Sequence, residues 1–197
     1  MEQREVFVSD GIRSVLKGRY IYLDNDFLGV LYGNKETFSG LFPILSVGVL
    51  MIDPFTKFEF LRDIFLPNER VYMENFVVSS IFTEPPNHND VFQKIQINGM
   101  ILSRIYSHQG RKNGISTVDL LLAGRLMYNN NTLLITGNKK DFPSCVFNIL
   151  GVINIENKNN GSLQSFSILE FDVEKFNVCN GELNKVLNKK ETVTLND

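Results

Sequence analysis

Short apolar runs alternate along the chain with longer segments in which hydrophobic residues recur at helical spacing. The compact run 20–23 leads directly into Asp24, and an Asn-rich turn at 157–161 separates the last two runs. Runs of this length, bounded by turn residues, are typical of buried strands. They predict strands at 20–23, 47–52, 132–136, 146–155 and 163–171.

Helix-start signals precede several of the intervening segments. Asp53 followed by Pro54 is typical of an N-cap and a first helical position. Ser116 can cap a later helix with Asp119 in its first turn. Ser9 can likewise cap a short helix that precedes the first strand.

Two further helices are expected from the spacing of apolar residues. One begins near Phe27, and the other covers 87–107, although Gly99 weakens its pattern. The segment 66–86 fits a helix, a strand or one after the other, so its structure stays open.

Strands that alternate with helices predict an α/β fold with a mainly parallel sheet, because each parallel pair needs a crossover connection. The 197 residues and 43% hydrophobic composition suit one domain, 1–197, with one sizeable core. We therefore expect a three-layer α/β/α domain. Ligands in such folds bind at the carboxyl ends of the strands, where Asp24 and the loop 137–141 are expected to lie.

The charge balance changes what this edge can bind. The chain has 20 basic and 22 acidic residues, a formal net charge of -2, so a polyanion must be met by local Lys or Arg or by metal ions. The two cysteines, Cys145 and Cys179, form no CxxC motif, which argues against a zinc site or a disulfide framework. We expect two reduced, half-buried thiols.

The N-terminal segment has no apolar run or small-residue cleavage site of a secretory signal, which predicts a cytoplasmic location. The longest apolar stretch, 41–52, is interrupted by Pro43, Ser46 and Gly48 and is shorter than the roughly 20 residues of a membrane span. No association with a membrane is expected.

Four acidic residues from separate predicted elements can meet at the strand ends. Asp24 follows the first strand, Glu59 lies in the helix after the second, Asp119 opens a helix and Asp141 follows the strand 132–136. Without a cation these carboxylates would repel one another. Mg²⁺ or Mn²⁺ prefers such oxygen ligands, and a bound ion of this kind can activate water for phosphodiester hydrolysis.

Four segments together resemble the PIN domain, a metal-dependent nuclease family. They span residues 22–28, 55–61, 115–123 and 134–142, of which the last, LITGNKKDF, is the most specific. The resemblance covers about residues 20–155 and implies a sheet of about five strands and cleavage of single-stranded RNA. Residues 156–197 fall outside it, and their strand 163–171 is expected to form a C-terminal β extension.

The resemblance also implies roles for individual residues. Asp24, Glu59, Asp119 and Asp141 would form the acidic site, with Asp24, Asp119 and Asp141 as metal ligands. Thr136 and Asn138 would be polar support, while Asp26 stands where the family often has Asn, which leaves its role open. Small PIN proteins often resemble toxins of toxin–antitoxin modules, which would imply an antitoxin partner and a homodimer.

Each acidic residue also has a purely structural interpretation. Asp119 can favour the helix dipole, Glu59 can pair with Arg62, and Asp141 can be a turn residue. Glu74, in the unassigned segment, is a rival for the second acid.

Basic and aromatic residues offer weaker signals. Contacts to phosphates, or an ordinary solvated surface, explain Lys139, Lys140, Arg104, Arg111 and Lys112 equally well. His88 and His108 lie away from the acid-rich segments. Five phenylalanines are expected in the core rather than as base-stacking platforms: Phe42, Phe55, Phe58, Phe60 and Phe65.

Two other functions compete with a nuclease. A catalytically silent PIN-like module would bind RNA or a protein without turnover. A metal-dependent phosphatase or receiver-like domain would use Asp24 and Asp26 and leave Asp119 and Asp141 without a role.

Overall fold

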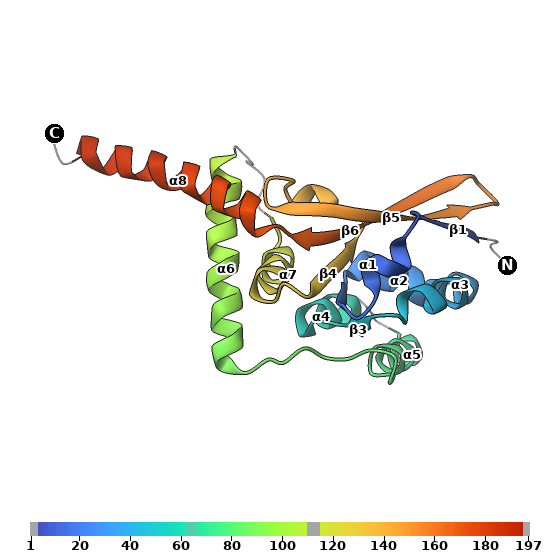
Figure 1. Ribbon diagram of the computed structural model, residues 1–197. Helices are drawn as coiled ribbons and strands as arrows, with labels where there is room; N and C mark the ends of the chain where they lie inside the picture. Colours follow the sequence, from blue (N-terminus) through green and yellow to red (C-terminus); the bar gives the residue numbers. More distant parts are fainter. Residues whose placement is uncertain (1–3, 63, 65, 110–114, 195–197) are drawn as a thin grey trace.

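A computed structural model describes residues 4–62, 64, 66–109 and 115–194 (Figure 1). Its centre is a six-stranded sheet with the strand order β1-β5-β6-β4-β2-β3. The strands are β1 (Arg4–Val8), β2 (Tyr20–Leu23), β3 (Val49–Met51), β4 (Thr132–Thr136), β5 (Phe147–Asn157) and β6 (Ser162–Phe171). All five predicted strands are confirmed to within a few residues, and β1 is an additional one.

Helices connect and flank the strands. They are α1 (Ile12–Leu16), α2 (Asn25–Gly33), α3 (Lys35–Leu45), α4 (Pro54–Arg62), α5 (Pro67–Val77), α6 (Asn89–His108), α7 (Thr117–Tyr128) and α8 (Val173–Thr194), with a short 3₁₀ helix, η1, at Lys139–Asp141. The open segment 66–86 therefore contains α5, after which Thr83 pairs with Met51 of β3 in parallel. None of the described helices is long and apolar enough to cross a bilayer.

The α/β class is confirmed, but the sheet is mixed. Strand β2 runs parallel to β3 and β4, whereas β4 with β6, β6 with β5 and β5 with β1 are antiparallel pairs. The reason is the short turn 158–161 between β5 and β6, in which Gly161 has a φ of 67°. A turn this short can join only antiparallel neighbours, since a parallel pair needs a crossover of a dozen or more residues.

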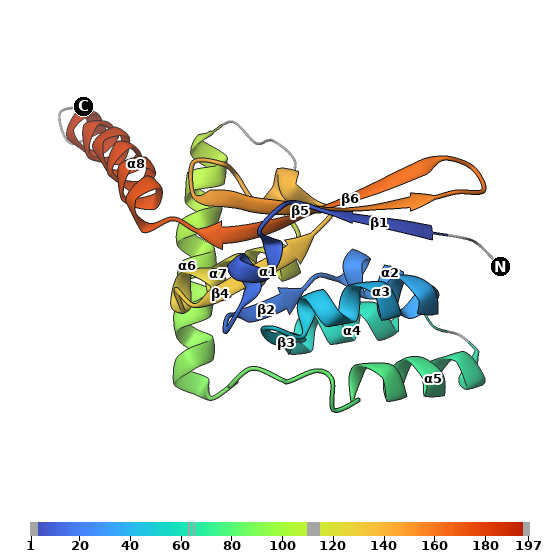
Figure 2. The same cartoon turned by 45° about the vertical axis from the view of Figure 1, so that its right-hand side comes forward.

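The prediction that the strand 163–171 forms a C-terminal extension outside the main sheet is wrong. Strand β6 lies between β5 and β4, in the interior of the sheet, and its residues Phe166, Ile168 and Leu169 are buried. After β6 the chain forms α8, which passes α6 and projects away from the sheet in both views (Figures 1 and 2). Residues beyond 155 thus complete the core.

Local signals explain where most helices begin. The Asp53 carboxylate accepts a hydrogen bond from the Phe55 N–H at 2.9 Å, and the Ser116 hydroxyl accepts one from the Asp119 N–H at 3.0 Å, so both predicted caps are confirmed. The predicted Ser9 cap is wrong. The Ser9 hydroxyl accepts from the Val152 N–H at 2.8 Å because β1 pairs with β5, and Gly11 at φ 71° precedes α1 instead.

Gly99 allows the close packing of α6 against α7. A Cβ atom at Gly99 would lie 3.0 Å from the Leu120 carbonyl oxygen, and one at Gly124 would lie 2.4 Å from that of Ile95. The predicted helix 87–107 is thus confirmed as α6. Gly99, which weakens the sequence pattern of α6, is required for the close approach of α7.

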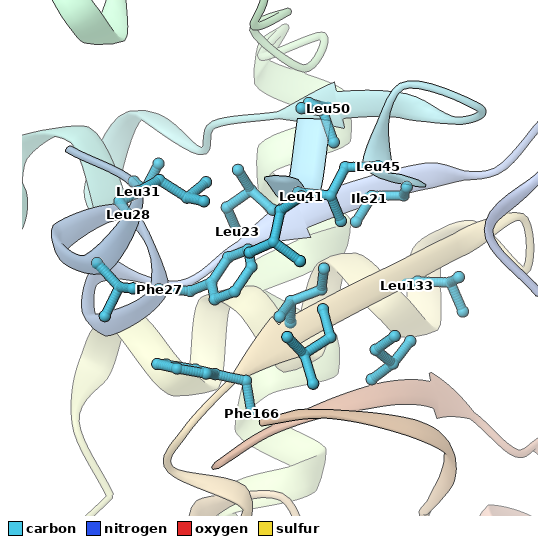
Figure 3. Packing of buried hydrophobic residues seen from close by; sticks show 14 of the residues in the cluster. Ile21, Leu23, Phe27, Leu28, Leu31, Leu41, Leu45, Leu50, Leu133 and Phe166 are labelled. Atoms are coloured by element: carbon cyan, nitrogen blue, oxygen red, sulfur yellow. The ribbon is translucent and has the colours of Figure 1, made fainter. Parts of the chain in front are cut away.

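Alternate residues of the strands pack into two apolar clusters on opposite faces of the sheet. Ile21, Leu23 and Leu133 pack with residues of α2 and α3 (Figure 3), whereas Tyr22 and Leu134 pack with residues of α6 and α7. Because successive side chains of a strand point to opposite faces of the sheet, each strand contributes residues to both clusters. This packing also fixes the strand ends, where the acidic residues lie.

Candidate functional site

Asp24 and Thr136 lie side by side at the carboxyl ends of β2 and β4. The two strands are parallel neighbours, and the Asp24 N–H donates to the Ile135 carbonyl at 3.0 Å. The Asp24 side chain, only 6% exposed, accepts from the Asn25 N–H at 2.8 Å and from the Thr136 hydroxyl at 2.6 Å. Asp24 therefore caps α2 while its second oxygen is oriented by β4.

The turn after β4 connects Asp24 to Asp141. The Thr136 hydroxyl accepts a hydrogen bond from the Asn138 N–H at 2.9 Å, and the Asn138 side-chain amide donates to the Asp141 carboxylate. Thr136 and Asn138 thus contact the carboxylates that the sequence assigns them to support.

Asp119 reaches the same region from the first turn of α7. Its carboxylate accepts from the Ser116 hydroxyl at 2.7 Å, and its side chain is 9% exposed. Burial, together with the nearby carboxylates of Asp24, Asp141 and Glu59, raises the pKa of Asp119 to about 6, against the lowering effect of the Ser116 hydrogen bond. Asp119 lies in the first turn of α7, as its helix-dipole interpretation requires. That interpretation does not explain why neighbouring acids raise its pKa.

The pKa values of Asp24 and Glu59 respond to the same neighbours. Burial raises the pKa of Asp24, opposed by its two hydrogen bonds, and Asp141 raises it further. Burial also raises the pKa of Glu59, which Arg62 lowers and Asp24 raises. The four acids predicted from separate elements are therefore close enough to act on one another.

Glu59 pairs with Arg62, as its structural interpretation predicts, and it is also affected by Asp24. Its carboxylate lies 3.8 Å from the Arg62 guanidinium on α4, while the side chain remains within the electrostatic reach of Asp24. The rival Glu74 is exposed on α5 and pairs with Arg70 at 2.8 Å. Of these two acids, Glu59 is therefore the one that lies near the acidic cluster.

Asp26 binds the backbone of the turn after β4. Its carboxylate accepts from the Gly137 N–H at 2.8 Å, and a Cβ atom at residue 137 would lie 2.4 Å from that oxygen, so the contact depends on glycine. Burial and the nearby Asp24 carboxylate together raise the pKa of Asp26 to about 6, against the lowering effect of its backbone hydrogen bonds. Asp26 is placed to position the turn that carries Asn138.

The donor set suits a hard divalent cation in its chemistry. Carboxylate oxygens are the ligands that Mg²⁺ and Mn²⁺ prefer, and mutually repelling acids of raised pKa favour a positive charge between them. Within the described ranges, however, no group of three or more His, Cys, Asp or Glu side chains is positioned to hold an ion. The carboxylates would have to draw together around it.

Lys139 and Lys140 lie on η1 beside the cluster. With Asp26, Asn138, Gln164 and Ser165 they line an open cavity of about 540 Å³ between the turn after β4 and strand β6. Arg111 and Lys112 lie outside the described residues. Arg104 and His108 line a different cavity, of about 460 Å³, between α6 and α8, and His88 directly precedes α6.

The expectation that the five phenylalanines are core residues is partly wrong. Phe60 is buried, but Phe58 is 67% exposed, Phe42 is exposed as well, and Phe55 is half-buried. Phe65 lies outside the described residues. The expected half-buried, free thiols are confirmed, and the Gln109 side-chain amide donates to the sulfur of Cys145.

A buried ion pair next to the site escaped the sequence analysis. Arg125 of α7 donates to the carboxylate of Asp53, to the Pro86 carbonyl at 3.2 Å and to the Asn87 side chain at 3.2 Å. Burial raises the pKa of the adjacent Tyr22 to about 12. An arginine inside the apolar stretch LLLAGRLM was the available signal, since an arginine is rarely buried unless paired.

A comparison of the chain with protein-family models, curated proteins and solved structures found no match. The resemblance to the PIN domain therefore rests on the four sequence segments and remains a prediction.

Proposed function

We propose that this protein is a metal-dependent endoribonuclease of the PIN type, which hydrolyses phosphodiester bonds in single-stranded RNA. The observation that supports this proposal is the convergence of Asp24, Glu59, Asp119 and Asp141 from four elements: burial raises the pKa values of Asp24, Glu59 and Asp119, and neighbouring acids of the set raise them as well. The three-layer PIN arrangement is part of the proposal. So are a cytoplasmic location and a role as the toxin of a toxin–antitoxin pair, with an antitoxin and a second copy as partners.

The proposed roles are those that the resemblance implies. Asp24, Asp119 and Asp141 would hold Mg²⁺ or Mn²⁺, which when bound supplies an activated water and positive charge at the phosphate. Glu59, at the edge of the cluster, would orient the water or add a ligand. The Thr136 hydroxyl fixes one oxygen of Asp24.

Two lysines beside the acidic cluster supply the local positive charge that binding of a polyanion needs. Lys139 and Lys140 lie on the turn that carries Asp141, so their ammonium groups can neutralise phosphates that flank the scissile bond. Such contacts position a strand without reading its sequence. This would let a protein of net charge -2 bind a polyanion locally.

One observation favours a second candidate, a silent module that binds RNA or a protein. The described carboxylates do not form a closed ligand set, and both oxygens of Asp24 already accept hydrogen bonds. A scaffold would keep that arrangement, whereas a nuclease would rearrange it around the ion.

The test is cleavage of labelled single-stranded RNA and DNA with Mg²⁺, Mn²⁺ or EDTA. We compare the native protein with Asp24→Asn, Asp141→Asn and the matched control Glu74→Gln, an exposed acid on α5, after confirming folding by circular dichroism. The nuclease predicts RNA cleavage that needs the metal, is lost in both Asn variants and is kept in the control. Binding without cleavage supports the silent module, and hydrolysis of a small phosphate ester alone supports a phosphatase.

A further inference from the structure

An apolar cavity of about 500 Å³ lies between α4, α6 and α7. Phe55 and Phe92 form part of its lining with their rings stacked, 5.7 Å between centroids and 20° between planes. The described lining carries no charged side chain, and its polar groups are those of Gln96, Ser103 and Thr117. The volume falls within the range of pockets that take small organic ligands.

The cavity shares two of its helices with the acidic cluster. Phe55 and Glu59 are four residues apart on α4, and side chains at this spacing are neighbours on one helix face, with about 5–6 Å between their Cβ atoms. Thr117 begins α7 two residues before Asp119. The aromatic lining is therefore close to the carboxylates of Glu59 and Asp119 along these two helices.

We propose that this cavity receives one unpaired nucleobase of the RNA beside the bond to be cut. The inference rests on the proposed function and names the form of its substrate. Aromatic faces stack on any base, and an amide with two hydroxyls can donate and accept at a base edge without demanding one sequence. A base seated between helices cannot be paired, so single-stranded RNA fits and a duplex does not.

The charge distribution separates the two sides of the site. Lys139 and Lys140 line the cavity beside β6, where phosphates would be neutralised, whereas the aromatic cavity is uncharged and suits a base. A strand that crosses the carboxylates would thus place its backbone at η1 and one base at Phe92. An apolar side chain of a second copy of this chain is the competing occupant, since Met100 at the rim is exposed.

The experiment measures binding separately from cleavage. Asp24→Asn protein in Mg²⁺ is titrated with a fluorescent RNA oligonucleotide and with a set in which one nucleotide at a time is abasic. Removing the seated base is expected to weaken binding about 5- to 150-fold at one position, because stacking contributes about 1–3 kcal/mol per base. Adding Phe92→Leu, which keeps an apolar side chain without a ring, should abolish that position dependence. Adding Phe58→Ala, an exposed ring on α4, should preserve it.

The outcomes distinguish the inference from the proposed function. A flat abasic scan overturns the inference even if the native protein cuts RNA. A position-dependent scan that needs Phe92 supports the inference even if the native protein cuts nothing, and then only the nuclease assignment fails. RNA that does not bind at all overturns both. A flat scan with dimerisation in gel filtration that Phe92→Leu abolishes shows that a second copy covers the cavity.

Discussion

Replacing Asp119 with asparagine is expected to stabilise the protein at neutral pH when no divalent cation is present. Burial and the neighbouring carboxylates raise the pKa of Asp119 from 3.8 to about 6. The folded protein then binds more protons than the unfolded chain. Its free energy of unfolding therefore falls as the pH rises from about 4 to about 6, and it stays reduced above that range.

The magnitude follows from that pKa. Each tenfold change in a dissociation constant corresponds to 1.36 kcal/mol, so the destabilisation has an upper limit of about 3 kcal/mol, which solvent screening reduces. Asparagine also loses the favourable interaction of a charge with the helix N-terminus, about 0.5 kcal/mol. We expect Asp119→Asn to gain about 1–2 kcal/mol at pH 7.5. The Ser116 cap remains, because it binds the backbone N–H of residue 119.

Thermal unfolding in EDTA at pH 7.5 and pH 4 measures this difference. A gain of 1–2 kcal/mol corresponds to a rise of roughly 2–8 °C in Tm for a chain of this size. At pH 4 the gain should vanish, since Asp119 is then protonated in the folded protein. Glu74→Gln, which removes an exposed acid paired with Arg70, should change Tm little at either pH. A loss of stability in Asp119→Asn at pH 7.5, or the same gain at both pH values, would refute the reasoning.

Three further changes test contacts near the site. Thr136→Val removes the hydroxyl that donates to Asp24 and accepts from the Asn138 N–H. It should lower the unfolding free energy by about 1–3 kcal/mol in a urea titration and abolish cleavage in the RNA assay. Thr136→Ser keeps the hydroxyl and should retain stability and cleavage. Gly137→Ala should destabilise by about 1 kcal/mol, and by less in the Asp26→Ala background, which a double-mutant cycle measures. Arg125→Met should lower the free energy of unfolding by about 3–5 kcal/mol in a urea titration, because it leaves the buried Asp53 carboxylate without its ion-pair partner.

The pattern of the sequence predicts the part of the fold that depends on local signals. The YIYL run and the Thr132–Thr136 run are too apolar and too short for anything but buried strands, and their parallel pairing places Asp24 beside Thr136. The Asp53 and Ser116 caps are equally local, because each side chain binds a backbone N–H two or three residues away. These signals suffice to bring the predicted acids to one edge.

The parts of the fold that differ from prediction have separate physical causes. Ser9 has the sequence of a helix cap, but its hydroxyl pairs with Val152, 143 residues away, once β1 adds to the sheet. The antiparallel pairing of β5 and β6 follows from the turn 158–161, because a turn this short cannot carry the crossover that parallel strands need. In α5 only Val77 is fully buried, with Met73 and Phe76 half-buried against the core, so few residues carry its periodic signal.

The strongest argument for a cation comes from two aspartates in equivalent positions. Asp24 and Asp53 follow the parallel neighbours β2 and β3, and both are buried, at 6% and 1% exposure. Asp53 is neutralised by Arg125, as a buried charge normally must be. The described partners of Asp24 are neutral donors, which orient its oxygens, while burial raises its pKa and another carboxylate, Asp141, raises it as well. The fold thus compensates one buried acid internally and leaves the other oriented by neutral donors and beside further acids, an arrangement that a divalent ion would complete.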